Sequence, residues 1–263
     1  MPLPSSGQIS LNDIHVEAGG TSLSEAGIND ADIRGLLSPT PASGSEMDFS
    51  DWYGASSAAS FKGSILATDG TSIANISFAN VNTIAAVGDL CIIAVASDLL
   101  LDATLVTVTG MTATTLNATN SPAPGWLFAY GFRQSGDSNT IGFSVSGNNG
   151  HGVSSVFSVF GGVSSLTNYS FLQSSGVPDP PNLVSASPTK LIVTTAHLDD
   201  DYILMTAPSG YTLAGANRVT HGGRYHSAVA VAYKITNTSQ AENPGQFGGG
   251  GNDAYAVYTL RFA

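Results

Sequence analysis

The chain has 263 residues, of which 42% are hydrophobic and only 10% are charged, against roughly a quarter charged in ordinary globular chains. A net charge of −11 without any lysine and arginine cluster excludes a partner held through a phosphate backbone, so we expect no nucleic acid. We also expect no membrane insertion, because no apolar stretch is long enough to span a bilayer, and no signal peptide, because the N-terminus has neither a basic nor an apolar region of the required kind. The single cysteine, Cys91, excludes an intrachain disulfide and is expected in the core.

Three short pieces occupy residues 9–54, each with a polar start, a few apolar residues and a glycine. Ser10 and Asp13 have capping-box spacing, with Asp in place of Glu or Gln, and Asn29 or Asp30 can cap a turn over 31–37. Helices this short are marginal in water, so we expect them to need a partner surface. Residues 1–54 are therefore predicted to be an arm that docks on another subunit. The alternative is that the arm folds back on its own domain.

The apolar residues of this arm are the candidates for the docking contact. They are Ile9, Leu11, Ile14, Ile33, Leu36, Phe49, Trp52 and Tyr53. A stretch of small residues, ASSAAS at 55–60, follows and is predicted to be a linker.

From residue 61 to residue 263 the pattern changes to alternating apolar and polar residues, rich in β-branched side chains and separated by turn signals. This pattern predicts an all-β domain preceded by an arm of short helical turns. The predicted strands are 61–67, 73–78, 89–97, 105–109, 126–133, 140–146, 153–161, 170–172, 190–197, 211–216, 227–235 and 254–261.

An internal repeat with a spacing of about 100 residues runs through this domain. The matching pairs are 89–98 with 190–199, 108–116 with 208–215, 126–143 with 228–247, and 154–163 with 253–262. Half a sandwich cannot bury its apolar face alone, whereas two sheets packed face to face can. We therefore expect one jelly-roll-like β-sandwich made from a duplicated β-unit, with pseudo-repeats at about 87–163 and 188–263 and each half contributing to both sheets. Two separate small sandwiches are the alternative.

Few residues suggest chemistry. Asp199, Asp200 and Asp201 are the densest charge and are weak candidates for a Ca²⁺ site, with a solvated loop as the alternative. No nucleophile motif and no marked carboxylate pair is found, so we expect no catalytic residue, no cofactor and no other metal ligand.

Aromatic and polar residues near predicted loops are the better candidates for binding. Aromatic rings suit the faces of sugars, and packing in the core or at its rim is the alternative for each residue. The candidates for a receptor or glycan contact are Trp126, Tyr202, Tyr211, Tyr225 and His226.

Residues 8–16 (QISLNDIHV) and 48–54 (DFSDWYG) resemble the N-terminus of tailed-bacteriophage virion proteins, in which an I-S-L-x-D opening leads to a closing S-D-x-Y-G. The later G-D-L at 88–90 and P-S-G-Y-T-L at 208–213 are similar to β-rich domains of phage tail and fibre proteins. The resemblance implies a non-enzymatic virion structural protein, attached to the tail or baseplate by its arm and presenting its sandwich as a tail fibre or host-receptor-binding module. A capsid decoration or head-fibre protein is the alternative, followed by a carbohydrate-active enzyme domain.

The same resemblance implies the partners and the location. We expect other phage structural proteins, such as tail or baseplate subunits, as partners, and a homo-oligomer, with a trimer favoured. A host surface glycan is a possible ligand. The expected location is the virion, after assembly in the host cytoplasm.

Overall fold

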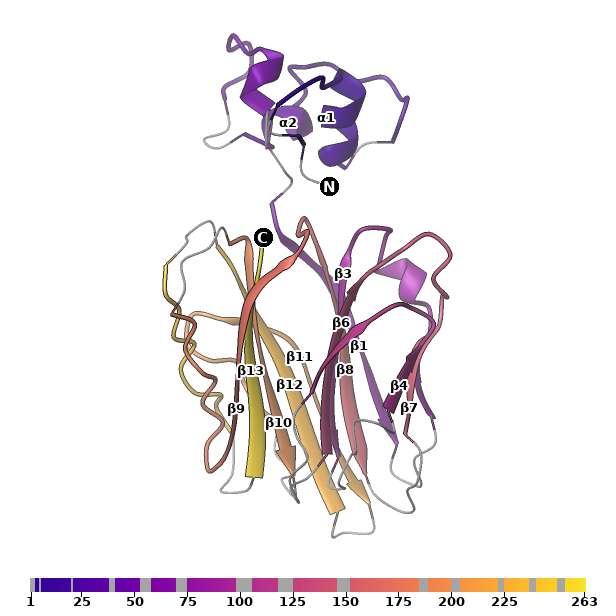
Figure 1. Ribbon diagram of the computed structural model, residues 1–263, viewed down its shortest axis with the longest axis vertical. Coiled ribbons are helices and arrows are strands. Elements are labelled where there is room, and N and C mark those ends of the chain that lie inside the picture. The colour runs from indigo at the N-terminus through magenta and orange to yellow at the C-terminus, as the bar shows by residue number, and fades with distance from the viewer. Residues whose placement is uncertain are drawn as a thin grey trace.

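The computed structural model describes residues 3–4, 6–19, 21–37, 41–52, 58–69, 75–97, 106–117, 125–145, 152–184, 189–199, 204–221, 225–236, 240–249 and 254–263. The helices among them are short: α1 (Leu11–Glu17), α2 (Ala31–Arg34), η1 (Phe49–Trp52) and η2 (Val81–Thr83). Figure 1 shows α1 and α2 beyond one end of the sheets, the end at which the C-terminus also lies. The expected class, an all-β sandwich with helical turns at its N-terminus, is confirmed.

The first half of the β-domain forms a five-stranded sheet in the order β1-β8-β3-β6-β5 and a three-stranded sheet in the order β2-β7-β4. All neighbouring strands in both sheets are antiparallel. The strands are β1 (Ser60–Asp69), β2 (Asn75–Phe78), β3 (Leu90–Ser97), β4 (Val106–Thr109), β5 (Thr114–Asn117), β6 (Gly125–Phe132), β7 (Ile141–Val145) and β8 (Val153–Gly161). This winding, with alternate strands assigned to two facing sheets, is that of a jelly roll.

The second half repeats the first sheet. Read from β9, its order is β9-β13-β10-β12-β11. The strands are β9 (Leu166–Ser175), β10 (Leu191–Asp199), β11 (Thr212–His221), β12 (Tyr225–Ile235) and β13 (Ala254–Phe262). The segments that repeat in sequence hold equivalent places, because β10, β12 and β13 correspond to β3, β6 and β8.

Each of the two repeats therefore builds one central sheet by itself. The expectation that each repeat contributes strands to both sheets is wrong. Pairing stays within a repeat even at the boundary, where β8 and β9 are neighbours in the chain but belong to different sheets. Each predicted strand overlaps a strand of the structure, but β5 was not predicted and β9 extends well beyond its predicted 170–172. The predicted linker ends early, since β1 begins at Ser60 and Ala59 is already buried.

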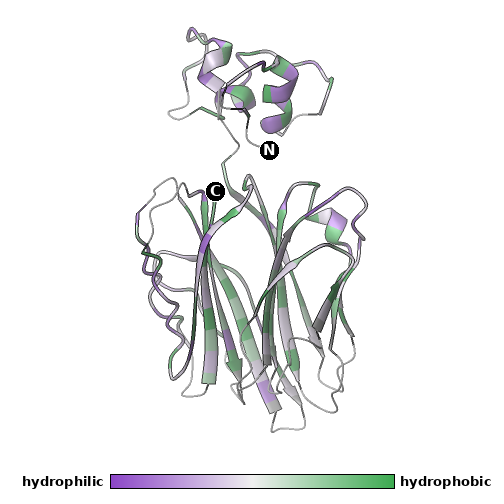
Figure 2. Cartoon of the chain, viewed as in Figure 1, coloured by the Kyte–Doolittle hydropathy of each residue, from purple (hydrophilic) through white to green (hydrophobic). Residues whose placement is uncertain are grey.

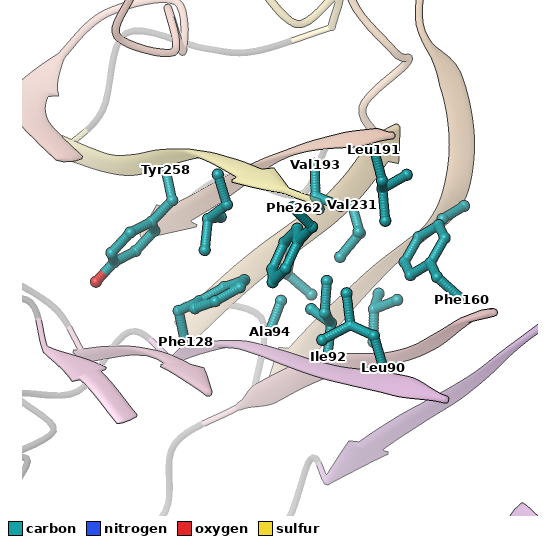
Figure 3. Packing of buried hydrophobic residues seen from close by; sticks show 14 of the residues in the cluster. Leu90, Ile92, Ala94, Phe128, Phe160, Leu191, Val193, Val231, Tyr258 and Phe262 are labelled. Carbon is teal, nitrogen blue, oxygen red and sulfur yellow. The ribbon is translucent and has the colours of Figure 1, made fainter. Parts of the chain in front are cut away.

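The two central sheets pack face to face, and their apolar faces interleave in one core (Figure 3). Leu90, Ile92 and Phe128 come from the first sheet, and Val193 and Phe262 come from the second. All five are completely buried. Figure 2 shows apolar residues concentrated along these central strands.

The outer face of each central sheet is covered in a different way. On the first, the β2-β7-β4 sheet buries Phe78 and Phe143 against β3 and β8. On the second, loops cover a cluster that includes Phe247, and the described part of these loops holds two isolated bridges, Leu183 to Glu242 and Thr206 to Gly248. In the order of the repeat, Leu183 falls where β2 lies in the first repeat and Thr206 falls where β4 lies. Their partners Glu242 and Gly248 fall where β7 lies. The loops thus stand in place of a third strand layer.

Burial on both faces explains the continuous apolar runs in the sequence. Every residue of β3 and of β8 is buried. Cys91 lies in β3 as expected, and burial raises the pKa of its thiol to about 12.

One histidine lies in the contact between the central sheets. His197 of β10 is fully buried, and its Nδ1–H donates to the carbonyl oxygen of Val95 on β3 at 2.8 Å. Its Nε2 then accepts from the hydroxyl of Thr195 at 2.9 Å, and its ring meets the ring of Tyr258 edge to face, with 5.7 Å between centroids. Both nitrogens are satisfied in the neutral ring. Burial lowers the pKa of His197 to about 4, against the opposing hydrogen bond to Val95.

This lowered pKa predicts acid sensitivity. The folded state favours neutral His197, so its contribution to stability is complete above pH 6.5 and is lost as the pH falls from 6.5 towards 4. Over that window the free energy of unfolding should fall by roughly 3 kcal/mol from this group. Denaturant titrations at several pH values should give a shallower pH dependence for His197→Gln than for wild type. Equal slopes in the two proteins would contradict the assignment.

Candidate functional site

The N-terminal unit, defined here as residues 3–52, is built from hydrogen-bonded turns. The predicted capping box is present, with Ser10 N donating to Asp13 Oδ2 at 2.8 Å and Asp13 N donating to Ser10 Oγ at 3.2 Å. Hydrogen bonds from Ser10 lower the pKa of the Asp13 carboxyl. Asp30 caps α2 through its backbone position, and its carboxylate accepts from Gly27 N at 2.7 Å. These local bonds position the short helices for packing.

The N-terminal unit has a core of its own. Ile14, Ile33 and Trp52 are completely buried together with Leu3. The indole Nε1–H of Trp52 donates to the carbonyl oxygen of Ile33 at 3.0 Å. The expectation that these pieces need a partner surface to bury their apolar residues is therefore wrong. Each piece is too short alone, but three pieces converge from α1, α2 and η1.

This core determines which predicted docking residues remain accessible. Ile14, Ile33 and Trp52 are inside it, and Ile9, Leu11 and Leu36 are half-buried against it. Phe49 is 42% exposed, and Tyr53 lies outside the described residues. The described members of the predicted set thus mostly hold the unit together, and among them Phe49 is the one left for a partner.

Leu23 is an accessible apolar residue that the sequence reasoning missed. Its side chain is 90% exposed and its φ is 65°, a left-handed conformation that is uncommon for leucine. Its backbone N–H donates to Asn12 Oδ1 at 2.7 Å, and the adjacent Ser24 hydroxyl donates to Thr21 O and lies 2.8 Å from His15 Nε2. The turn is therefore tied to α1 with Leu23 displayed in solvent.

Val16 extends this apolar feature. It is 44% exposed and lies four residues after Asn12, on the side of α1 to which the turn is tied. Strained backbone at an exposed residue commonly marks a functional contact. No periodicity reveals Leu23 in the sequence, because it stands alone among polar residues.

The N-terminal unit is also linked to the β-domain by charge. Lys190, just before β10, has its pKa lowered by burial, while the carboxylate of Glu17 at the end of α1 acts in the opposite direction. The ammonium of Lys190 donates to the carbonyl oxygen of Gly162 at 3.1 Å.

The structure does not gather the predicted glycan residues into one site. Trp126 is 3% exposed in the central core, so it is not available to a ligand and that prediction is wrong. The reason is that β6 lies inside a sheet covered on both faces, so that residues just after a turn are already buried. His226 is half-buried on β12. Tyr202 and the side chain of Tyr225 lie outside the described residues.

Tyr211 anchors the loops over the second sheet. Its hydroxyl donates to Glu242 Oε1 at 3.1 Å, and Lys234 Nζ lies 2.9 Å from the same oxygen. Burial, followed by the charge of Glu242, raises the pKa of Tyr211 well above its ordinary value. The Lys234 ammonium also lies 5.9 Å from the Tyr211 ring centroid. These contacts indicate a structural role.

The acidic run falls largely outside the described residues. Asp199 ends β10, its side chain is not among those described, and Asp200 and Asp201 are not described. In the described part of the chain, no three His, Cys, Asp or Glu residues are grouped so that they could hold a metal ion.

No family model, curated protein or solved structure matches this chain. Among the described residues, no helix has both the length and the apolar character needed to cross a membrane.

Proposed function

We propose that the protein is a non-enzymatic structural protein of a tailed-phage virion. In this proposal the N-terminal unit attaches the chain to the tail or baseplate, and the β-sandwich is presented as a tail fibre or host-receptor-binding module. The observation that carries the proposal is the N-terminal unit itself, a separately packed body that displays an apolar side chain on a strained turn.

Two further observations support this proposal. Of the residues that resemble phage virion proteins, 8–16 and 48–54, the described ones (8–16 and 48–52) belong to the N-terminal unit. Jelly rolls also recur in viral capsid proteins and lectins, which is an argument by analogy of fold. A capsid decoration or head-fibre protein is the second candidate, because the same attachment unit would serve on a capsid.

Leu23 is suited to be a central contact of the attachment. The turn that carries Leu23 is already held by hydrogen bonds, so its backbone loses little conformational freedom on binding. The left-handed backbone costs the free protein of order 1 kcal/mol. Leu23 holds this left-handed conformation although its side chain is not buried, which is consistent with selection for contact with a partner protein.

Substitution of Leu23 should separate stability from attachment. Leu23→Gly removes the side chain and relieves the positive φ, so thermal unfolding should be unchanged or slightly higher. Incorporation into particles, measured by quantitative mass spectrometry of purified virions, should fall by roughly tenfold, because burial of a leucine side chain contributes about 1.5–3 kcal/mol. The matched control is Val184→Gly, which changes an 85% exposed residue of the β-domain and should leave incorporation normal.

Truncation of the chain tests the attachment role independently of Leu23. Deletion of residues 1–54 should leave a soluble β-domain that does not join particles. Normal incorporation of that truncated protein would contradict the attachment role, and normal incorporation of Leu23→Gly would remove Leu23 from the contact.

Homo-oligomerisation, with a trimer favoured, is a second part of the proposal. Only 10% of the residues are charged, so copies can pack side by side with few charges to desolvate. Native mass spectrometry of the full-length protein should give three times the 26.8 kDa chain mass. A monomeric mass at micromolar concentration would contradict self-association of the isolated protein.

A further inference from the structure

A groove of about 440 Å³ lies on the outer side of the second repeat, between the loop after β9 and the loop before β13. The loops concerned run beside β9 in Figure 1. Residues that line the groove include Leu172, Asp179, Pro180, Asn182, Asn243 and Gln246. Its volume lies within the range of small-ligand sites.

The groove lies where the two repeats differ. In the first repeat the corresponding segments pair as β2 and β7, with Ile76 opposite Phe143. In the second repeat the described segments retain the single bridge from Leu183 to Glu242, beside which the chain opens into the groove. At this place the second repeat therefore has a concave polar surface where the first repeat has paired strands.

The walls of the groove are fixed in position. Pro178, Pro180 and Pro244 are buried. The backbone of Leu183 and Glu242 is joined by two hydrogen bonds of 2.9 Å, and Phe247 N donates to Pro178 O at 2.9 Å. Prolines also restrict the backbone before a ligand arrives. The groove is thus preformed, which reduces the entropy cost of binding.

The lining side chains have the chemistry of saccharide recognition. Asp179, Asn182 and Gln246 are exposed, and no described residue makes a hydrogen bond with their side chains. Amides both donate and accept, and a carboxylate accepts from a hydroxyl, which matches the groups that a sugar presents. Leu172, 39% exposed, and the half-buried Pro181 add apolar surface for sugar C–H groups.

The net charge of the chain and the number of carboxylates in the groove further restrict the class of ligand and the reaction. A chain of net charge −11 disfavours acidic sugars. The described lining residues include one carboxylate, Asp179, whereas glycoside hydrolysis ordinarily uses a pair. Binding without cleavage is the function that this arrangement supports.

We propose that this groove binds a neutral saccharide. The proposal deepens the proposed host-attachment function by naming a ligand class and a site, and it rests on that function only for the source of the saccharide. It replaces Trp126 and Tyr211 as glycan contacts with residues of the two groove loops.

The test uses the full-length protein and saturation-transfer NMR with lactose, maltotriose, chitotriose and sialyllactose as probes. At least one neutral oligosaccharide should show transfer, and sialyllactose should bind no better than lactose. The double variant Asn182→Ala/Gln246→Ala should weaken binding by at least about tenfold, since both amides lose their hydrogen bonds to the sugar hydroxyls. Both side chains are exposed, so the thermal midpoint should not change.

Gln134→Ala is the matched control, because it removes an exposed amide from a loop of the first repeat. It should bind like wild type. Lack of transfer to every neutral probe, or undiminished binding by the double variant, would overturn the proposal. Particle incorporation separates the two functions, because the groove variant should still incorporate normally and Leu23→Gly should still bind the saccharide.

Discussion

Face-to-face packing of the two central sheets is the constraint on which the rest of the β-domain depends. Each sheet is five strands wide and apolar on both faces, so each needs a cover on both sides. The sheets cover each other on the inside, where His197 of one sheet reaches the backbone of Val95 on the other. The outer faces then require further layers, and the chain supplies a three-stranded sheet in one repeat and loops in the other.

This division leaves the second repeat free to vary on its outer side. Its loops need only bury a small cluster that includes Met205 and Phe247, and the clamp of Glu242 by Tyr211 and Lys234 holds them in place. The exposed polar side chains of the loops are then available for a ligand. The N-terminal unit, in contrast, buries its own core, and the residues of that core all come from the unit itself. The molecule thus separates a candidate attachment surface from a candidate binding surface.

Local patterns in the sequence predicted much of this fold. Apolar runs such as 89–97 predicted the buried strands, the repeat predicted the duplication, and Ser10 with Asp13 predicted the cap that is present. Long-range packing was not predictable in the same way. Sequence spacing does not reveal that Ile14, Ile33 and Trp52 meet in one core, that Trp126 lies between two sheets, or that Leu23 is held in solvent by Asn12. The sequence did not predict the groove, because the proline and glycine residues of its loops indicate only turns.

Cryo-electron microscopy of intact particles carrying this protein would test its attachment to the tail or baseplate, because it locates the chain. If the attachment role is right, density for the N-terminal unit should be seated on a tail or baseplate subunit, with Leu23 in the contact and the β-sandwich projecting outward. Location on the capsid would replace this account with the decoration role. Absence of the chain from purified particles would contradict the virion assignment altogether.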